Sequence, residues 1–178
     1  ELYDRSINDP DGFWTEHAER LYWIEKWHTL TESDFDKAQI RWFIGGKINA
    51  CYNCVDRHVD DGHGDDTALI WEGNDPNESR TFTYAELQAE VQKAANALKD
   101  LGLAKGDRVC IYMQMIPELT IAMLACARIG VVHSIVFGAF SADSLVTRIN
   151  DSECQAIITQ DTGVRGTKLD IPMKSNAD

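Results

Sequence analysis

The sequence predicts an α/β fold, in which a mostly parallel sheet is flanked by helices and preceded by an aromatic-rich helical arm. Strand-like apolar runs alternate with helix-length segments after residue 107, and strands joined by helices pair in parallel through right-handed crossovers. The first 42 residues instead concentrate large aromatic side chains. We therefore divide the chain into an arm over residues 1–66 and an α/β part over residues 67–178. The tryptophans of the arm are Trp14, Trp23, Trp27 and Trp42.

The arm is predicted to contain a one-faced helix. Phe13, His17, Leu21 and Ile24 recur at near four-residue spacing, which is typical of an amphipathic helix. Asp11 is placed to accept hydrogen bonds from the unpaired amides at the start of this helix. Because large aromatic rings dominate burial energetics, we expect the tryptophans to pack the arm against the larger body.

A hairpin followed by a long helix is predicted at the start of the α/β part. Residues 67–72 and 79–83 are strand candidates, and the glycine- and proline-containing turn between them favours a hairpin. Thr83 and Glu86 form a capping box, and Gly102 is suited to the left-handed stop of the helix. The residues expected on the buried face of this helix are Leu87, Val91, Ala94, Leu98 and Leu101.

Strands and helices alternate in the rest of the chain. Pro117 suits the first turn of a helix, and Gly130 ends that helix after an almost wholly apolar run. Ser141 is placed to cap a further helix that carries Leu145 and Ile149 on one face. The strands are expected over residues 108–113, 131–137 and 155–159.

The charge of the chain argues against binding to polyanions. Seventeen basic and 29 acidic side chains give a formal charge of −12, which repels nucleic-acid phosphates and anionic lipid. No apolar run approaches the ~20 residues of a membrane span, and the first residues lack the form of a signal peptide. We expect a cytoplasmic protein that binds small molecules, without a nucleic-acid or membrane partner.

The five cysteines are expected to be reduced thiols. Cys51, Cys54 and His58 have spacings compatible with zinc, but a closed site needs a fourth ligand and only His63 is near. A redox pair is disfavoured because that motif belongs at a strand-to-helix junction. Neither histidine accompanies a recognisable nucleophile, so we predict no metal site and no catalytic residue in this chain.

One loop is a candidate phosphate-binding segment. The Gly45-Gly46-Lys47 sequence fails the Walker pattern, and no strand is followed by the glycine signature of a dinucleotide site. Residues 162–168, in contrast, form a basic, glycine-bearing loop after the last predicted strand. Arg165 and Lys168 are suited to hold phosphate, and Gly166 lets a ligand approach the backbone. The residues alone favour an ordinary surface loop over a phosphate-binding one for this segment, and only the family resemblance given below reverses that preference.

Four segments in order resemble the acetyl-CoA synthetases, members of the acyl-adenylate-forming superfamily. The first is Asn-Ala-Cys-Tyr-Asn-Cys-Val-Asp-Arg-His-Val at residues 49–59. The others are Tyr-Met-Gln-Met-Ile-Pro-Glu at 112–118, Ala-Met-Leu-Ala-Cys-Ala-Arg-Ile-Gly at 122–130 and Val-Phe-Gly-Ala-Phe-Ser at 136–141. The resemblance extends from about residue 9 to the end of the chain.

This resemblance implies a two-step ligase reaction. ATP and acetate give acetyl-adenylate and pyrophosphate, and the thiol of coenzyme A then displaces AMP. The segment Arg165, Gly166, Thr167 and Lys168 corresponds to a contact on the nucleotide part of coenzyme A. Lysine stands at 168 where some members have arginine, which removes the bidentate fork at that position.

The resemblance also implies that the groups binding ATP and Mg²⁺, the acyl pocket and the catalytic lysine follow residue 178. We therefore expect an N-terminal fragment of the enzyme's large domain, with an incomplete sheet, which is inactive without the remainder of the parent enzyme. A propionyl-CoA synthetase fragment is one alternative, although the Val164-Arg165-Gly166 sequence favours acetate. A non-enzymatic α/β module that binds a nucleotide or regulates another protein is the other.

Overall fold

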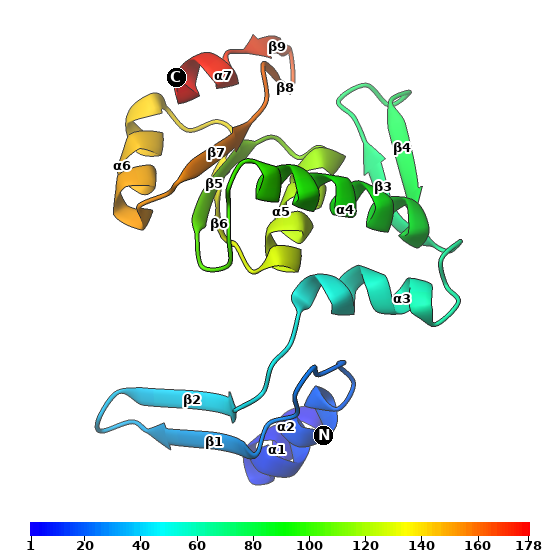
Figure 1. Cartoon of the computed structure of the whole chain (residues 1–178), viewed down its shortest axis with the longest axis vertical. Helices are drawn as coiled ribbons and strands as arrows, with labels where there is room; N and C mark the ends of the chain where they lie inside the picture. Colours follow the sequence, from blue (N-terminus) through cyan, green and yellow to red (C-terminus); the bar gives the residue numbers. More distant parts are fainter.

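The computed structural model describes all 178 residues and places the two termini at opposite ends of its longest axis (Figure 1). Its central element is a three-stranded parallel sheet with the strand order β6-β5-β7. The strands are β5 (Arg108–Met113), β6 (Val132–Phe137) and β7 (Ala156–Thr159). The predicted α/β fold with a parallel sheet is confirmed.

Helices cover both faces of the sheet. The helices α4 (Tyr84–Asp100) and α5 (Pro117–Ile129) pack on one face, while α6 (Ala142–Ser152) and the short α7 (Met173–Ala177) lie on the other (Figure 1). The central strand β5 is therefore buried on both sides, as expected for a strand between two helical layers. Its side chains alternate between a larger core on the α4 and α5 side and a smaller core on the α6 and α7 side. The larger core includes Val109, Ile111 and Met113, and the smaller includes Cys110 and Tyr112.

The predicted helix boundaries of the α/β part follow from local capping. Thr83 and Glu86 satisfy each other's backbone amides in a complete capping box. Pro117 occupies the first turn of α5, and Gly130 ends that helix in the left-handed conformation with a φ of 76°. Ser141 accepts a hydrogen bond from the start of α6.

The hairpin before α4 also forms where the sequence predicts it. Strands β3 (Thr67–Glu72) and β4 (Ser79–Thr83) pair antiparallel, with an irregularity near the start of β3. The buried face of α4 is confirmed for Leu87, Val91 and Leu98. Leu101 is different, because the helix ends at Asp100 and leaves this side chain 78% exposed.

The arm contains a shorter helix than predicted. Helix α1 covers Leu2–Asn8, and α2 covers Pro10–Ala18. The carboxylate that caps α2 belongs to Asp9, which accepts from the amide of Gly12, and not to Asp11. The proline at the first helical position fixes this earlier start. Because α2 ends at Ala18, Leu21 and Ile24 lie outside the helix and are exposed.

The arm also contains a hairpin that the sequence does not predict. Strands β1 (Thr29–Asp34) and β2 (Gln39–Ile44) pair antiparallel and project from the rest of the molecule (Figure 1). The ring of Phe43 lies 5.3 Å from the rings of both Trp23 and Trp27. The rings of Trp14 and Trp42 are 6.2 Å apart. The tryptophans thus hold the arm together internally, and the prediction that they pack it against the body is wrong.

A short helix near the end of the arm, called the junction helix below, connects the rest of the arm to the body. It begins with one π-helical turn, η1 (Tyr52–Asp56), and continues as α3 (Arg57–Asp60). On the arm side, the amide of Asn53 accepts from the backbone N–H of Tyr22 at 2.8 Å and donates to its carbonyl at 2.9 Å. On the body side, Asn49 donates to two carbonyls at the end of α5. The arm is therefore anchored through this helix.

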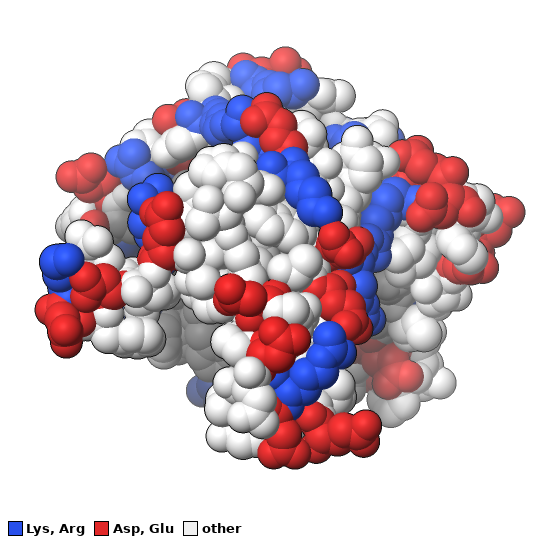
Figure 2. Space-filling model, turned by 90° about the horizontal axis from the view of Figure 1, so that it is seen from below, with Lys and Arg blue, Asp and Glu red and all other residues white.

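The surface carries charges of both signs. Figure 2 shows acidic and basic side chains around a broad uncharged area on the face seen from below. Many of these charges form exposed ion pairs, among them Glu32 with Arg41 and Glu25 with Lys47. No helix combines the length and apolar character that crossing a bilayer would require.

Candidate functional site

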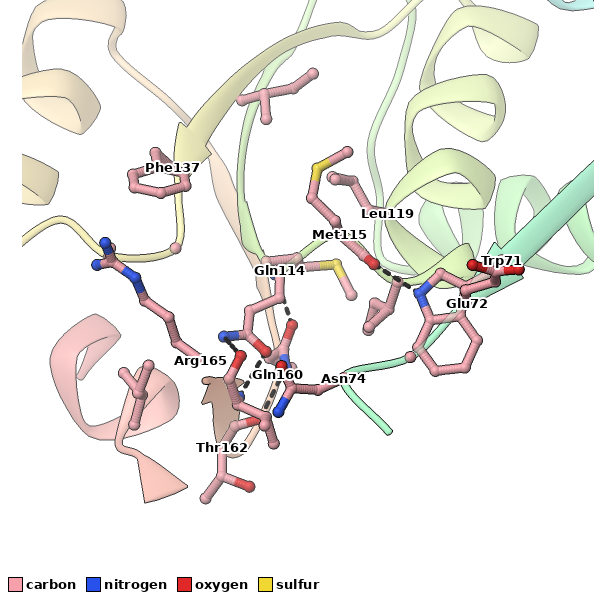
Figure 3. Close-up of a pocket in the computed structure, with 18 of the residues that line it drawn as sticks. Trp71, Glu72, Asn74, Gln114, Met115, Leu119, Phe137, Gln160, Thr162 and Arg165 are labelled. Carbon is pink, nitrogen blue, oxygen red and sulfur yellow. Dashed lines mark hydrogen bonds between the residues drawn. The ribbon is translucent and has the colours of Figure 1, made fainter. Parts of the chain in front are cut away.

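A cavity of about 700 Å³ opens at the carboxyl end of the parallel sheet (Figure 3). The carboxyl ends of parallel strands are where open α/β sheets bind ligands. Segments following β5, β6 and β7 contribute to its walls, and the turn of the β3–β4 hairpin closes another side. Its lining is mainly apolar and includes Trp71, Met115, Leu119, Phe137 and Ile171, together with the polar Asn74, Gln114, Gln160 and Arg165.

The basic segment next to this cavity is a hairpin and not the loop that the sequence predicts. Strands β8 (Gly163–Arg165) and β9 (Lys168–Ile171) pair antiparallel. Gly166 adopts a φ of 57° in the two-residue turn between them, a conformation that glycine adopts without strain. The short strands were missed because three or four residues give too little alternation to be recognised.

This hairpin brings the predicted site residues together. Arg165 and Lys168 are cross-strand partners, so their side chains leave the hairpin on the same face. Arg165 lines the large cavity, where Figure 3 shows it extending toward the side of Phe137. Thr167 and Lys168 line a neighbouring surface hollow. Both cations are exposed and neither forms an ion pair within the chain.

Side-chain amides fix the hairpin to the sheet. The Gln114 side chain, just after β5, donates to the carbonyl of Val164 at 2.8 Å and accepts from its N–H at 2.7 Å. The Gln160 side chain, just after β7, accepts from the N–H of Gln114 and donates to the carbonyl of Thr162, each at 2.7 Å. Asn74 donates to the carbonyl of Gly166 at 2.8 Å.

These amide residues were not among the predicted site residues. Gln114 and Gln160 are nevertheless the first polar side chains beyond two apolar strands, at the same sheet end as the basic segment. Ligands bind at the carboxyl ends of parallel strands, and this rule, which singles out residues 162–168, applies to Gln114 and Gln160 as well. Asn74 gives no comparable signal, because its contact spans 92 positions of the chain.

The cysteine and histidine cluster does not converge on one point. Cys51 is fully buried beside Asp56 and Arg128, whereas Cys54 is exposed. Burial raises the pKa of the Cys51 thiol, and the hydrogen bond from Arg128 opposes that rise. The His58 ring stacks on Tyr84 with 4.5 Å between centroids. No group of three or more potential ligands in the chain is arranged to hold a metal ion.

The glycine pair near the end of β2 has a structural role. Gly45 has a φ of 80° in the turn that leaves the hairpin. The next basic residue, Lys47, pairs with Glu25 through its backbone in an isolated bridge and through its side chain at 2.7 Å. Gly45 and Lys47 thus take part in the arm's own packing.

Comparison with known proteins assigns the family. Residues 55–177 match the AMP-binding enzyme family, and the chain belongs to this family. Residues 1–54 match a second family, described as the acetyl-coenzyme A synthetase N-terminus. The junction helix described above contains the point where the two matches meet.

The relatives that align along the whole chain are named acetyl-coenzyme A synthetases. The acetyl-coenzyme A synthetase of Rubrobacter xylanophilus is 56% identical over 177 residues, covering 99% of this chain and 27% of the relative. The acetyl-coenzyme A synthetase of Alkalilimnicola ehrlichii is 54% identical over 179 residues, which cover 100% of this chain and 27% of the relative. Among solved structures, an acetoacetyl-CoA synthetase from Streptomyces lividans has a TM-score of 0.87 and 25% identity, covering 98% of this chain and 26% of its own. The chain thus spans about a quarter of the length of the proteins it matches.

Proposed function

We propose that this chain is the amino-terminal part of an ATP-dependent acetate–CoA ligase. Such an enzyme converts ATP, acetate and coenzyme A to acetyl-CoA, AMP and pyrophosphate through an acetyl-adenylate. The proposal is supported by the N-terminus family match and by relatives named acetyl-coenzyme A synthetase that align along the whole chain. We keep the division into an arm over residues 1–66 and an α/β part over 67–178.

Within that enzyme, we assign the β8–β9 turn to the nucleotide part of coenzyme A. The observation that carries this assignment is a pair of exposed, unpaired cations, Arg165 and Lys168, held opposite each other at the edge of the cavity. Phosphate oxygens accept charge-assisted hydrogen bonds, and the guanidinium supplies two parallel donors. Gly166 and Thr167 form the turn and allow a ligand close to the backbone.

The positive charge of the β8–β9 turn is essential for binding an anion, because the chain as a whole has a formal charge of −12. Coenzyme A is itself anionic, so a site on this surface needs cations that are not already neutralised. Arg165 and Lys168 meet that requirement. We assign ATP and Mg²⁺ to other parts of the longer enzyme, as the resemblance to the acetyl-CoA synthetases implies.

The test separates the two half-reactions of the longer ligase that carries this chain. Arg165→Glu is expected to raise the KM for coenzyme A about ten- to a hundredfold, the effect of losing one charge-assisted hydrogen bond. Acetate-dependent exchange of pyrophosphate into ATP needs no coenzyme A, and it is expected to stay within about a factor of three. Lys99→Glu, which reverses an unpaired charge at the end of α4, is the matched control and is expected to change neither quantity.

An equal fall in both half-reactions for Arg165→Glu would show that the arginine supports the fold instead of the ligand. The choice of acetate is tested separately by comparing kcat/KM for acetate and propionate in the same enzyme. A preference for propionate would overturn the acyl assignment and leave the coenzyme A assignment intact.

A further inference from the structure

We propose that Gln114 is a positioning residue that holds the Arg165–Lys168 hairpin in the geometry that binds coenzyme A. This inference rests on the proposed function, and it adds a residue argued to act through Arg165 and Lys168. Gln114 comes from the end of β5, 50 positions before its partner in the hairpin.

The Gln114 amide acts as a short substitute for a neighbouring strand. Its Nε2 donates to the carbonyl of Val164 at 2.8 Å, and its Oε1 accepts from the N–H of the same residue at 2.7 Å. These are the two bonds that β8 would otherwise exchange with an adjacent strand. Because Val164 directly precedes Arg165, the clamp fixes the backbone from which the guanidinium extends (Figure 3).

The surrounding residues leave the glutamine little freedom. Its own backbone N–H donates to Gln160, which in turn holds the carbonyl of Thr162 at the start of the hairpin. Gly163 packs so closely that an added Cβ would lie 2.6 Å from Nε2 of Gln114. The carboxyl ends of β5 and β7 and the first strand of the hairpin therefore form one connected unit.

The hairpin needs this support because it is small. Its two strands comprise three and four residues, and an isolated two-stranded hairpin is marginally stable in water. Without the clamp, coenzyme A would have to order the hairpin as it binds, which lowers the apparent affinity. The cost should appear in the step that uses coenzyme A and not in adenylation.

Gln114→Met keeps the length of the side chain and removes both hydrogen bonds. We expect it to raise the KM for coenzyme A about five- to twentyfold in the longer ligase, with pyrophosphate exchange within about a factor of two. Hydrogen–deuterium exchange is expected to accelerate in the peptide containing Val164, whose amide loses its acceptor. Gln114→Leu, which also removes both hydrogen bonds and adds no charge beside Arg165, provides a second variant and should also raise the KM.

Gln155→Met is the matched control. Gln155 makes the same kind of contacts at the opposite end of β5, accepting from the N–H of Arg108 and donating to the carbonyl of Glu153. Its loss is expected to leave the KM for coenzyme A unchanged. An unchanged KM in both Gln114 variants, or an equal rise in Gln155→Met, would overturn the inference. If Arg165→Glu also left the KM unchanged, the coenzyme A assignment itself would have failed; an effect of Arg165→Glu alone would remove only the role of Gln114.

Discussion

A single guanidinium nitrogen of Arg128 bridges both carboxylate oxygens of Asp56, at 2.8 and 2.7 Å. Arg128 belongs to the last turn of α5 and Asp56 to the π-helical turn at the base of the arm. Gln88 of α4 donates to the same carboxylate at 2.9 Å. The side chains are 28% and 9% exposed, so this ion pair joins the junction helix to the core of the body under partial exclusion of water.

Arg128→Met is therefore expected to lower the free energy of unfolding by about 2–4 kcal/mol, since it leaves a buried carboxylate without its cation. Urea denaturation followed by tryptophan fluorescence measures the change. Lys37→Met is the control, because it breaks the exposed pair with Asp34, where a loss of less than about 1 kcal/mol is expected. Equal losses in the two variants would contradict the structural role of the Arg128–Asp56 pair.

The cysteines are expected to differ sharply in reactivity toward a thiol reagent at neutral pH. Cys54 is exposed, whereas Cys51, Cys110 and Cys126 are at most 1% exposed. Cys54 should therefore react fastest in the native chain and the half-buried Cys154 more slowly, and Cys54→Ser should abolish the fastest phase. Mass spectrometry of the labelled peptides identifies the site. Rapid labelling of Cys51 instead would contradict the packing of the junction helix.

The buried thiols also predict a loss of stability in alkali. Burial raises the pKa of Cys110 from 9.0 to about 11, with Cys154 adding to the rise, and burial alone raises the pKa of Cys126 to about 11. Between pH 9 and 11 the unfolded chain releases these protons while the native chain retains them, so the free energy of unfolding decreases as the pH rises. Below pH 9 both states hold the protons, so the stability is fully present and these two thiols cause no pH dependence.

Urea denaturation across that pH range measures the slope. The double variant Cys110→Ala and Cys126→Ala starts from a lower stability, because it creates cavities, but it should lose stability less steeply above pH 9. If the free energy of unfolding fell equally steeply with pH in the variant and the parent chain, the loss of stability in alkali would come from groups other than these two thiols.

The open side of the sheet predicts self-association of the 178-residue chain. Strand β6 is an edge strand, and Val132, Ile135 and Phe137 on it are 56%, 47% and 59% exposed. Exposed apolar edges favour pairing between molecules. We expect light scattering to show an apparent mass that rises with concentration and falls in Ile135→Lys. Leu101→Lys, which removes an exposed leucine away from any strand, should not change it, and a monomer at all concentrations would contradict the prediction.

The α/β part could be predicted from the sequence because its boundaries are encoded locally. The Thr83–Glu86 capping box, the first-turn Pro117 and the left-handed Gly130 each act within a few residues of the helix end they define. Such signals are visible without knowledge of the fold. The apolar β5 sequence likewise identifies a buried strand by itself.

The arm hairpin depends on distant contacts and was missed for that reason. Strand β1 is the polar sequence Thr-Leu-Thr-Glu-Ser-Asp, and it is held by pairing with β2 rather than by its own pattern. Phe43 adopts a positive φ of 51°, which no local rule anticipates for an aromatic residue. In the candidate site, the cations were accessible to sequence reasoning, but the Gln114 and Asn74 contacts depend on the folded sheet.

The number of residues in the π-helical turn at Tyr52–Asp56 sets the direction in which the arm leaves the body. Such a turn accommodates one residue more than the α-helical spacing, and each helical residue corresponds to about 100° of rotation. Deleting one residue there would turn Asn53, which holds the backbone of Tyr22, about a quarter of a revolution away from its partner. Substitutions in this helix would weaken the contacts that hold the arm, whereas a one-residue deletion would change the orientation of the arm relative to the body.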